Sequence, residues 1–379
     1  MIGFELSEEQ IALQDMARKF ADKEMKPVAA KYDQSKEFAW DVMEKAFQAG
    51  FLTSSIPTEY GGGGLGAIDT SIISEELAAG CAGLFTSIMA NSLALTPIML
   101  FGTDEQKKEF LTPFSAKPML SAFCLTEREA GSDAGGVKTT AVKDGSDYVI
   151  NGSKCFITNG GVASLHVLFA STDTNKGTRG ISAFIVPNDT PGIQVGKVED
   201  KMGQRASNTT EVFFDDVRIP QSNLLAKEGL GFVVAMKTLD KARASVGAAG
   251  VGVARAAYDY CIEYTKSRRQ FGKPLSAFQH LAFKMADMAM EIDASRHMVR
   301  YAAWLLDNNK KASCESAMAK CYSSDVAMRT TVEGVQILGG YGYMRDYPME
   351  KLMRDAKLLQ IYEGTNEIQR LVISHNILS

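Results

Sequence analysis

One carboxylate near the C-terminal end of the sequence stands where a predicted helix is interrupted. In QIYEGTNEIQR (360–370), an apolar run stops at Glu363, breaks at Gly364, and restarts at residues suited to begin a helix. These residues alone leave two interpretations open. Glu363 is either a surface acid at a helix end or a carboxylate in apolar surroundings, where a raised pKa would fit it to remove a proton.

Other stretches have the composition of ligand-binding loops. CLTEREAGSD (124–133) and CFITNGG (155–161), expected at opposite ends of one strand pair, combine hydroxyls, small residues and backbone amides. Such groups suit the edge or phosphates of a planar cofactor, although polar β-turns have the same composition. The adjacent guanidiniums of Arg268 and Arg269 could clamp a diphosphate or simply interact with a helix C-terminus.

Two further patterns indicate structure and not chemistry. YGGGGLGAID (60–69) contains G-x-G-x-x-G, but no β-rich run precedes it, which predicts a surface loop instead of a dinucleotide site. The six cysteines and four histidines are scattered without a CxxC pair. We therefore expect no disulfide framework and no metal site.

The composition is that of an ordinary globular protein. The 379 residues exceed one typical domain, and 45% are hydrophobic and 23% charged. A net charge of -4 gives no electrostatic reason to bind nucleic acid or an anionic membrane. No unbroken apolar run of membrane-spanning length is found, so no membrane span is expected. The N-terminus lacks a signal or transit pattern, which favours the cytoplasm, with the mitochondrial matrix left open for a trimmed mature chain.

Local patterns divide the chain into three domains and predict an α+β fold. Residues 1–117 have helical patterns, with capping boxes at Ser7-x-x-Gln10 and Thr103-x-x-Gln106. Residues 118–228 contain short β-rich runs, which predict a small β-barrel or sandwich. Within them, Asn151-Gly152 predicts the two-residue turn of a hairpin.

Residues 229–379 are predicted to form a four-helix bundle. The first helical stretch, 231–271, could reach about 60 Å at 1.5 Å per residue. Further amphipathic stretches lie near 278–309, 312–338 and 348–376. The first stretch contains Gly247, Gly250 and Gly252, which lower the helix propensity of that stretch. We therefore expect these glycines to serve close approach by a neighbouring helix.

Six motifs occur in one order over nearly the whole chain: TE-x-x-AGSD, FITNGG, MGQR, R-x-x-FGK, QILGG-x-G and MRDAK-x-x-QIYEGTNEIQ. Together they resemble the acyl-CoA dehydrogenase family of flavoenzymes, especially its short- and medium-chain, butyryl-CoA-type members. The resemblance implies an N-terminal helical domain, a middle β-domain and a C-terminal four-helix bundle. It also implies non-covalent FAD, a homotetramer, and delivery of electrons to an electron-transferring flavoprotein.

The resemblance assigns roles to residues at matching positions. Contact with the flavin ring is implied for Phe123, Leu125, Thr126, Gly131, Ser132, Phe156, Ile157 and Thr158. Contact with the FAD diphosphate or adenosine of a neighbouring subunit is implied for Arg268, Gln270, Phe271 and Gln279, with Gln336 and Gly340 nearby. FAD contacts also fall on Thr365 and Glu367, and contacts to the CoA portion on Ser132, Asp240 and Arg243. The reacting thioester would be bordered by Tyr362 and Gly364.

By the same resemblance, Glu363 is the catalytic base. It would remove the Cα proton of an acyl-CoA while hydride passes from Cβ to the flavin nitrogen N5, giving the 2-enoyl-CoA. The backbone N–H of Glu363 and a ribityl hydroxyl would stabilise the developing enolate. Two alternatives stay open: an acyl-CoA oxidase or enoyl-CoA reductase, and a non-catalytic flavin or acyl-CoA binding protein.

Departures from the family pattern bear on the substrate. Some branched- and long-chain members carry the base at the position of Ala242. Alanine cannot remove a proton, so Glu363 has no competing candidate for the base. Glutaryl-type members have an arginine near the position of Leu84, so an apolar acyl tail is favoured over a dicarboxylate. Met89-Ala90 replaces an acid and a glycine at the expected pocket floor, and a large Met89 could shorten the tunnel. We therefore expect short- to medium-chain or cyclic acyl groups.

Overall fold

The computed structural model describes residues 5–379. The N-terminal part is helical, and both predicted capping boxes are confirmed, since Ser7 Oγ accepts from the Gln10 backbone amide and Thr103 Oγ1 from that of Gln106. Its helices are α1 (Glu8–Phe20), the π-helix η1 (Ala21–Met25), α2 (Lys26–Ser35), α3 (Trp40–Gln48), α4 (Ala67–Gly80), α5 (Ala82–Phe101) and α6 (Asp104–Ala116). The loop before α4 follows a 3₁₀ turn (Thr58–Tyr60) and no strand, as the lack of a β-rich run before its glycines predicted.

Helix α5 is long and apolar enough to cross a membrane by composition, with a mean hydropathy of 1.6. The sequence predicted no membrane span here, because serine, threonine and asparagine interrupt its apolar residues. However, 72% of the stretch is buried inside the protein, as in a core helix. Leu84 and Ile88 are fully buried in the cluster that joins α5 to the long helices.

The middle part forms one mixed sheet with strand order β6-β7-β3-β2-β4-β5-β8, to which β1 adds by parallel pairing with β4. Most neighbours are antiparallel, and buried apolar side chains on β3, β4, β5 and β7 pack together. The strands are β1 (Ser121–Cys124), β2 (Thr140–Asp144), β3 (Asp147–Thr158), β4 (Leu165–Ser171), β5 (Ile181–Pro187), β6 (Ile193–Val198), β7 (Thr209–Pro220) and β8 (Leu224–Leu225).

The predicted turn at Asn151-Gly152 is wrong. These residues lie inside β3, where the register with β7 shifts between Ile150 and Gly152. The tight turn falls instead at Gly145-Ser146, between β2 and β3. Gly152 has a φ of 151°, so the glycine serves an irregularity within a strand, where glycine often marks a bulge.

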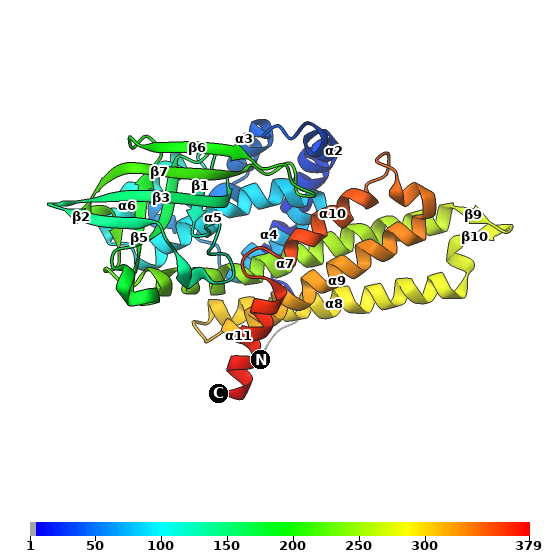
Figure 1. Cartoon of the computed structure of the whole chain (residues 1–379). Coiled ribbons are helices and arrows are strands. Elements are labelled where there is room, and N and C mark those ends of the chain that lie inside the picture. Colours follow the sequence, from blue (N-terminus) through cyan, green and yellow to red (C-terminus); the bar gives the residue numbers. More distant parts are fainter. Residues whose placement is uncertain (1–4) are drawn as a thin grey trace.

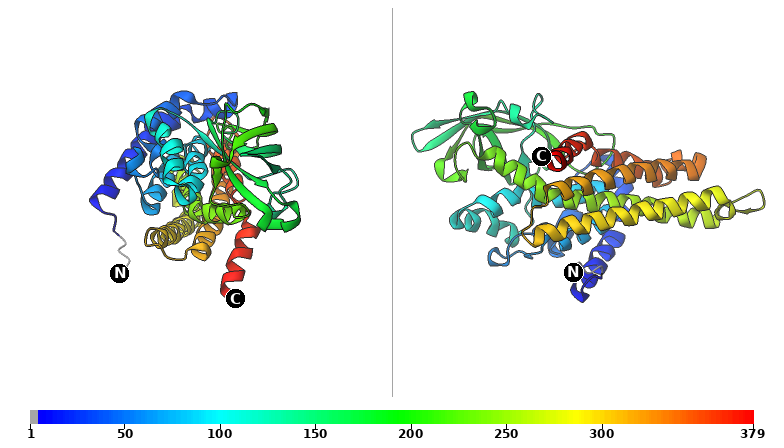
Figure 2. Two further views of the ribbon diagram at one scale, coloured as in Figure 1. Left: turned by 90° about the vertical axis from the view of Figure 1, so that its left-hand side faces the viewer. Right: turned by 90° about the horizontal axis from the view of Figure 1, so that it is seen from below.

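The C-terminal part contains long helices that run side by side (Figure 2). Its elements are α7 (Gly231–Ser267), the hairpin strands β9 (Arg269–Gln270) and β10 (Lys273–Pro274), α8 (Gln279–Asp307), α9 (Ser313–Leu338), α10 (Met349–Leu359) and α11 (Asn366–Leu378). The predicted fourth helix is thus two helices with a break at 360–365. The sheet lies at one end of the molecule and the β9–β10 hairpin at the opposite end (Figure 1).

The glycines of α7 allow two other helices to approach closely, as predicted. A Cβ added at Gly252 would lie 2.2 Å from the backbone carbonyl oxygen of Glu75 on α4. One added at Gly250 would lie 2.9 Å from the carbonyl carbon of Ser323 on α9. Helix α7 therefore packs against the N-terminal helices and the bundle at once, and this packing fixes how the two parts meet.

Candidate active site

A cavity of about 930 Å³ lies where the three parts of the chain meet. Its wall includes α5, the loop after β1, the end of β3, α7 and the break between α10 and α11. Most of the predicted site residues line it, namely Met89, Phe123, Leu125, Thr126, Gly131, Ser132, Phe156, Thr158, Arg243, Tyr362, Glu363, Gly364 and Thr365. Residues from distant parts of the sequence are therefore brought together by the fold.

Other predicted residues lie outside this wall. Ile157 is buried in the core of the sheet, while Glu367 is exposed in the first turn of α11. Asp240 lies behind Arg243, whose Nη1 donates to its Oδ1 at 2.6 Å, and it also accepts from Ser313 Oγ at 2.5 Å. Asp240, held by Ser313, can therefore fix the orientation of the Arg243 guanidinium.

A separate group of predicted residues sits at the far end of the long helices, around the β9–β10 hairpin (Figure 1). The Arg268 guanidinium lies over the Tyr341 ring, 5.4 Å from its centroid. Phe271 is 92% exposed at the tip of the hairpin. The group, which does not line the cavity of the same chain, comprises Arg268, Gln270, Phe271, Gln279, Gln336 and Gly340.

Glu363 projects into the cavity from the break between α10 and α11. Its backbone has a φ of 52°, in the left-handed region that residues with a side chain seldom adopt. Its Oε2 is buried and has no hydrogen-bond partner among the described residues. Burial raises the pKa of Glu363 to about 7, against the opposing charges of Lys320 and Arg243. The local geometry thus favours the second interpretation of this residue.

Buried donors hold the carbonyl groups of the same turn. Gln369 Nε2 donates to the carbonyl oxygens of Glu363 and Gly364 at 3.2 and 2.8 Å. Lys320 Nζ donates to the Gly364 carbonyl at 2.9 Å. A left-handed residue costs about 1–3 kcal/mol and persists where its surroundings fix it, as these bonds do. Sequence reasoning missed Lys320 and Gln369. A lysine among the small residues of AMAKCYSS was the available signal for the first.

The wall beside Tyr362 is fixed by contacts between domains. Thr86 Oγ1 on α5 donates to Gln204 Oε1 at 2.7 Å, and both side chains contact the Tyr362 hydroxyl. Gln204 Nε2 donates in turn to the backbone carbonyl of Asp355 on α10 at 3.1 Å. The MGQR motif therefore joins the helical parts at the cavity.

The two hydroxyl-rich stretches of the middle domain lie side by side, not at opposite ends of a strand pair as expected. The backbone amide of Cys155 donates to the Thr126 carbonyl at 3.0 Å. Phe156 has a φ of 56° and is 65% exposed at the cavity wall. Together the stretches form a wall with hydroxyls and backbone groups that fits the edge of a flat ring.

A buried ion pair supports this wall. Lys154 Nζ donates to the Leu125 carbonyl at 3.0 Å and to Glu127 Oε1 at 2.7 Å. Glu127 also accepts from the backbone amides of Lys138 and Thr139, at 2.6 and 3.0 Å. Glu127 is therefore fully engaged, unlike Glu363, although both line the cavity.

The cavity also contains lysines that sequence reasoning missed. Burial lowers the pKa of Lys201 to about 8, and its Nζ donates to the Ser207 carbonyl at 2.7 Å. Burial also lowers the pKa of Lys241, which neighbours Ala242 in the wall, against the charge of Asp307. Neither lysine belongs to a motif that sets it apart from other surface cations.

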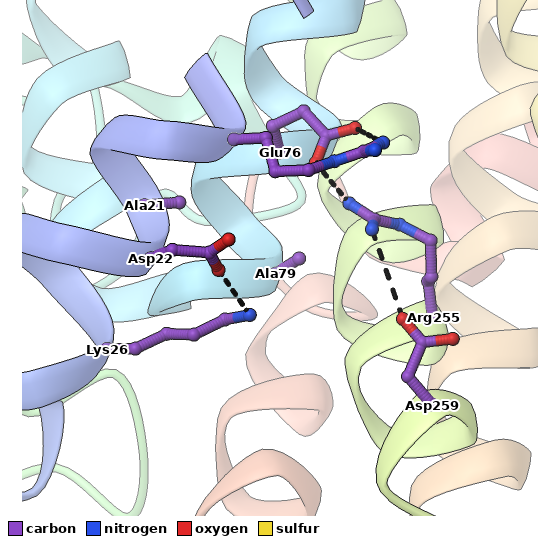
Figure 3. Close-up of a pocket in the computed structure, with 8 residues that line it drawn as sticks. Ala21, Asp22, Lys26, Glu76, Ala79, Arg255 and Asp259 are labelled. Carbon is purple, nitrogen blue, oxygen red and sulfur yellow. Dashed lines mark hydrogen bonds and ion pairs between the residues drawn. The ribbon is translucent and has the colours of Figure 1, made fainter. Parts of the chain in front are cut away.

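A second cavity, of about 440 Å³, lies between the N-terminal helices and α7. Figure 3 shows Glu76 of α4 facing Arg255 of α7, with Asp259 beside the arginine. Glu76 is paired with Arg18 at 2.8 Å and with Arg255 at 2.6 Å. Because these charges pair with one another, we interpret the residues around this cavity as an ion-pair network that attaches α1 and α4 to the bundle.

Comparison with known families covers nearly the whole chain. The N-terminal domain of acyl-CoA dehydrogenases matches residues 7–117, the middle domain residues 122–217, and the C-terminal domain residues 229–378. The chain belongs to the acyl-CoA dehydrogenase family. The resemblance inferred from six motifs and the predicted fold class are both confirmed. The family is one of flavoprotein oxidoreductases.

Individual members of the family are similar over their full length. A short-chain specific acyl-CoA dehydrogenase of Clostridium acetobutylicum is 45% identical over 377 residues, covering 99% of this chain and 100% of the relative. The structure of butyryl-CoA dehydrogenase from Megasphaera elsdenii is 43% identical with a TM-score of 0.97, covering 100% of both chains. A chain in a structure described as the electron transferring flavoprotein of Acidaminococcus fermentans is 46% identical, also with a TM-score of 0.97 and full coverage of both chains.

Proposed function

We propose that this protein is an FAD-dependent dehydrogenase that converts a short- to medium-chain acyl-CoA to the 2-enoyl-CoA. The observation that carries the proposal is Glu363, a carboxylate at the cavity wall with a buried, unpartnered oxygen and a pKa raised to about 7. A general base works best when its pKa lies near the working pH, because it is then ionised and still basic.

In the proposed reaction Glu363 removes the Cα proton of the acyl thioester. Its unpartnered Oε2 is free to accept that proton. The Glu363 and Gly364 carbonyls are bonded to Gln369 and Lys320, which keeps them from competing with the substrate for donors. The backbone N–H of Glu363 is then the expected donor to the thioester oxygen, where negative charge develops.

FAD, when bound, would supply the acceptor for the hydride that leaves Cβ. Two segments fit the flavin ring, the loop from Phe123 to Ser132 and the strand end from Phe156 to Thr158, because both present backbone groups and hydroxyls to the cavity. Thr365 would approach the cofactor from the opposite wall. Arg243, oriented by Asp240, together with Ser132, would bind the CoA portion.

The distal group of predicted cofactor residues supports a homo-oligomer. Arg268, Gln270, Phe271, Gln279, Gln336 and Gly340 do not line the cavity of their own chain. In a tetramer these residues would approach the FAD diphosphate or adenosine held mainly by a neighbouring subunit. An exposed Phe271 fits burial against another copy. Glu367, exposed at the start of α11, stays a proposed cofactor contact.

The electron acceptor is proposed to be an electron-transferring flavoprotein, supported by similarity to a chain in a structure described as such a protein. The bacterial relatives favour a cytoplasmic location. The acyl group is proposed to be short, medium or cyclic, because Met89 lines the cavity and Leu84 stands at the approximate position of the glutaryl-binding arginine.

A panel of thioesters tests the proposal. The purified flavoprotein is mixed without oxygen with butyryl-, hexanoyl-, octanoyl-, cyclohexanecarbonyl- and glutaryl-CoA, and bleaching of the flavin is followed by stopped flow. We expect bleaching by the apolar acyl groups and none by glutaryl-CoA. Rapid reoxidation in air with formation of peroxide would identify an oxidase instead. Binding without bleaching by every thioester would support a non-catalytic binding protein.

A further inference from the structure

Lys320 of α9 lies behind the turn that carries Glu363. Its side chain is 0% exposed, which is unusual for a lysine and requires partners for the ammonium. Lys320 Nζ donates to the Gly364 carbonyl and to Asn366 Oδ1, both at 2.9 Å. Gly364 belongs to the break between α10 and α11 and Asn366 begins α11, so the lysine contacts both the turn that carries Glu363 and the helix that follows it.

We propose that Lys320 is a positioning residue for Glu363, holding its left-handed backbone conformation and stabilising its ionised carboxylate through a buried positive charge. The proposal deepens the proposed function and rests on it. Lys320 would not contact the substrate, since it bonds to the turn from behind and is not among the residues that line the cavity.

The first part of the role is geometric. Glu363 and Gly364 have φ values of 52° and 92°, and the direction of the carboxylate depends on both. Lys320 fixes the carbonyl that follows these two angles. Asn366 completes the attachment, because its Nδ2 donates to Ser324 Oγ at 2.9 Å. Lys320 and Asn366, the first residue of α11, therefore both attach the turn to α9.

The second part of the role is electrostatic. Among the charges that oppose the burial of Glu363, Lys320 acts most strongly and Arg243 next. Burial lowers the pKa of Lys320 to about 8, so it remains largely charged at neutral pH. Besides Glu363, the groups that act on Lys320 are Cys321, Arg243 and Asp325. Removing its charge should leave Glu363 harder to ionise.

A purely structural lysine, joining α9 to α11, is the competing explanation. It would affect stability but not the proton equilibrium of Glu363. The comparison requires Lys320→Met, which removes charge and donors, and Lys320→Arg, which retains a charge. Lys351→Met is the matched control, because Lys351 is also buried but pairs with Asp355 at 2.5 Å.

The experiment measures flavin bleaching by butyryl-CoA against pH in each holoenzyme. For Lys320→Met we expect the midpoint to rise by about one pH unit or more, since an adjacent opposite charge shifts a carboxyl pKa by about 1–3 units. Bleaching at pH 7 should then fall by about fivefold or more, because the ionised fraction of Glu363 drops from about one half to about one eleventh when the pKa rises from 7 to 8. Lys320→Arg should show a smaller shift, and Lys351→Met none. An unchanged midpoint in Lys320→Met overturns the electrostatic role, and an unchanged Glu363 conformation in its crystal structure overturns the geometric one.

An infrared readout of the Glu363 carboxyl keeps the inference separate from the proposed reaction. Infrared titration of the apoprotein identifies the Glu363 carboxyl as the band lost in Glu363→Gln, and Lys320→Met should move its titration to higher pH. If wild type bleaches with none of the thioesters, the proposed function fails, but the infrared shift still decides the role of Lys320. If Lys320→Met does not fold, Lys320→Gln provides the same two measurements with a polar side chain.

Discussion

Lys154 Nζ lies 2.7 Å from Glu127 Oε1 within the wall of the large cavity, and both side chains are buried. The lysine also holds the Leu125 carbonyl, so one ammonium connects β3 to the loop proposed to face the flavin. The two charges offset each other, which makes the loss of either one more costly than the loss of both.

Glu127→Gln should destabilise the protein by about 3–5 kcal/mol, because it leaves the Lys154 charge buried without a counter-ion. The double variant with Lys154→Met should recover part of this loss. Urea unfolding of the apoproteins measures both effects. Asp15→Asn, which breaks an exposed pair with Lys19, is the control and should leave the unfolding midpoint unchanged. Additive losses in the double variant would show that the pair is not coupled.

Glu363→Gln removes the proposed base while keeping the size of the side chain. We expect flavin bleaching by acyl-CoA to slow by at least about 10³-fold, since the chemical step lacks its proton acceptor. The dissociation constant for the thioester, measured by perturbation of the flavin spectrum, should change less than about threefold. A variant that bleaches at the wild-type rate would remove Glu363 from the mechanism.

The pH dependence follows from the same residue. Glu363 must be ionised to accept a proton, and burial raises its pKa to about 7. The value of kcat/KM should therefore be constant above this pH and fall about tenfold for each unit below it. Flavin absorbance at each pH controls for loss of the cofactor. A midpoint near 4.5 would instead place Glu363 in contact with solvent.

Met89→Ala should enlarge the acyl end of the cavity, which Met89 lines. Each additional buried methylene contributes about 0.8 kcal/mol, so burying about two more methylenes of octanoyl-CoA in the space left by Met89 should raise the ratio of its kcat/KM to that of butyryl-CoA roughly tenfold. The measurement is a chain-length series on the variant and the wild type. An unchanged ratio would show that another residue sets the floor of the tunnel.

Gly252→Ala should destabilise the contact between α7 and α4, because its Cβ would lie 2.2 Å from the Glu75 carbonyl oxygen. Overpacking of about 1–3 kcal/mol exceeds the gain in helix propensity of about 1 kcal/mol. Gly247→Ala is the comparison, since its Cβ would lie 2.9 Å from Val299 Cγ2 and 3.3 Å from the Ala319 carbonyl carbon, a milder overlap than that at Gly252. Thermal unfolding should show the larger loss for Gly252→Ala.

Periodicity and capping in the sequence were sufficient to predict the helical ends of the chain and the β-rich middle. They failed at Asn151-Gly152, because the same two residues serve a hairpin turn or an irregular strand, and only pairing with β7 decides between them. The interruption at Glu363-Gly364 was predicted from the glycine and the helix-starting residues after it. Its left-handed conformation was not predicted, because contacts from Lys320 and Gln369, which are distant or follow the turn, stabilise it.

The cavity residues were predicted through family motifs, whereas their supports were not. Glu363 and Phe156 lie within recognisable segments, and both are found at the wall. Lys320 and Lys154 are single lysines whose burial depends on residues more than 20 positions away, so local sequence contains no signal of their partners.

The wall of the large cavity is drawn from all three parts of the chain, so any ligand bound there ties those parts together. Binding to the native state adds stability by mass action, about 2.7 kcal/mol at a ligand concentration 100 times the dissociation constant. With FAD as the bound cofactor, as proposed, the lifetime of the protein in a cell should depend on the supply of that cofactor. Chains made when FAD is scarce would open more often and be degraded sooner than chains made when it is abundant.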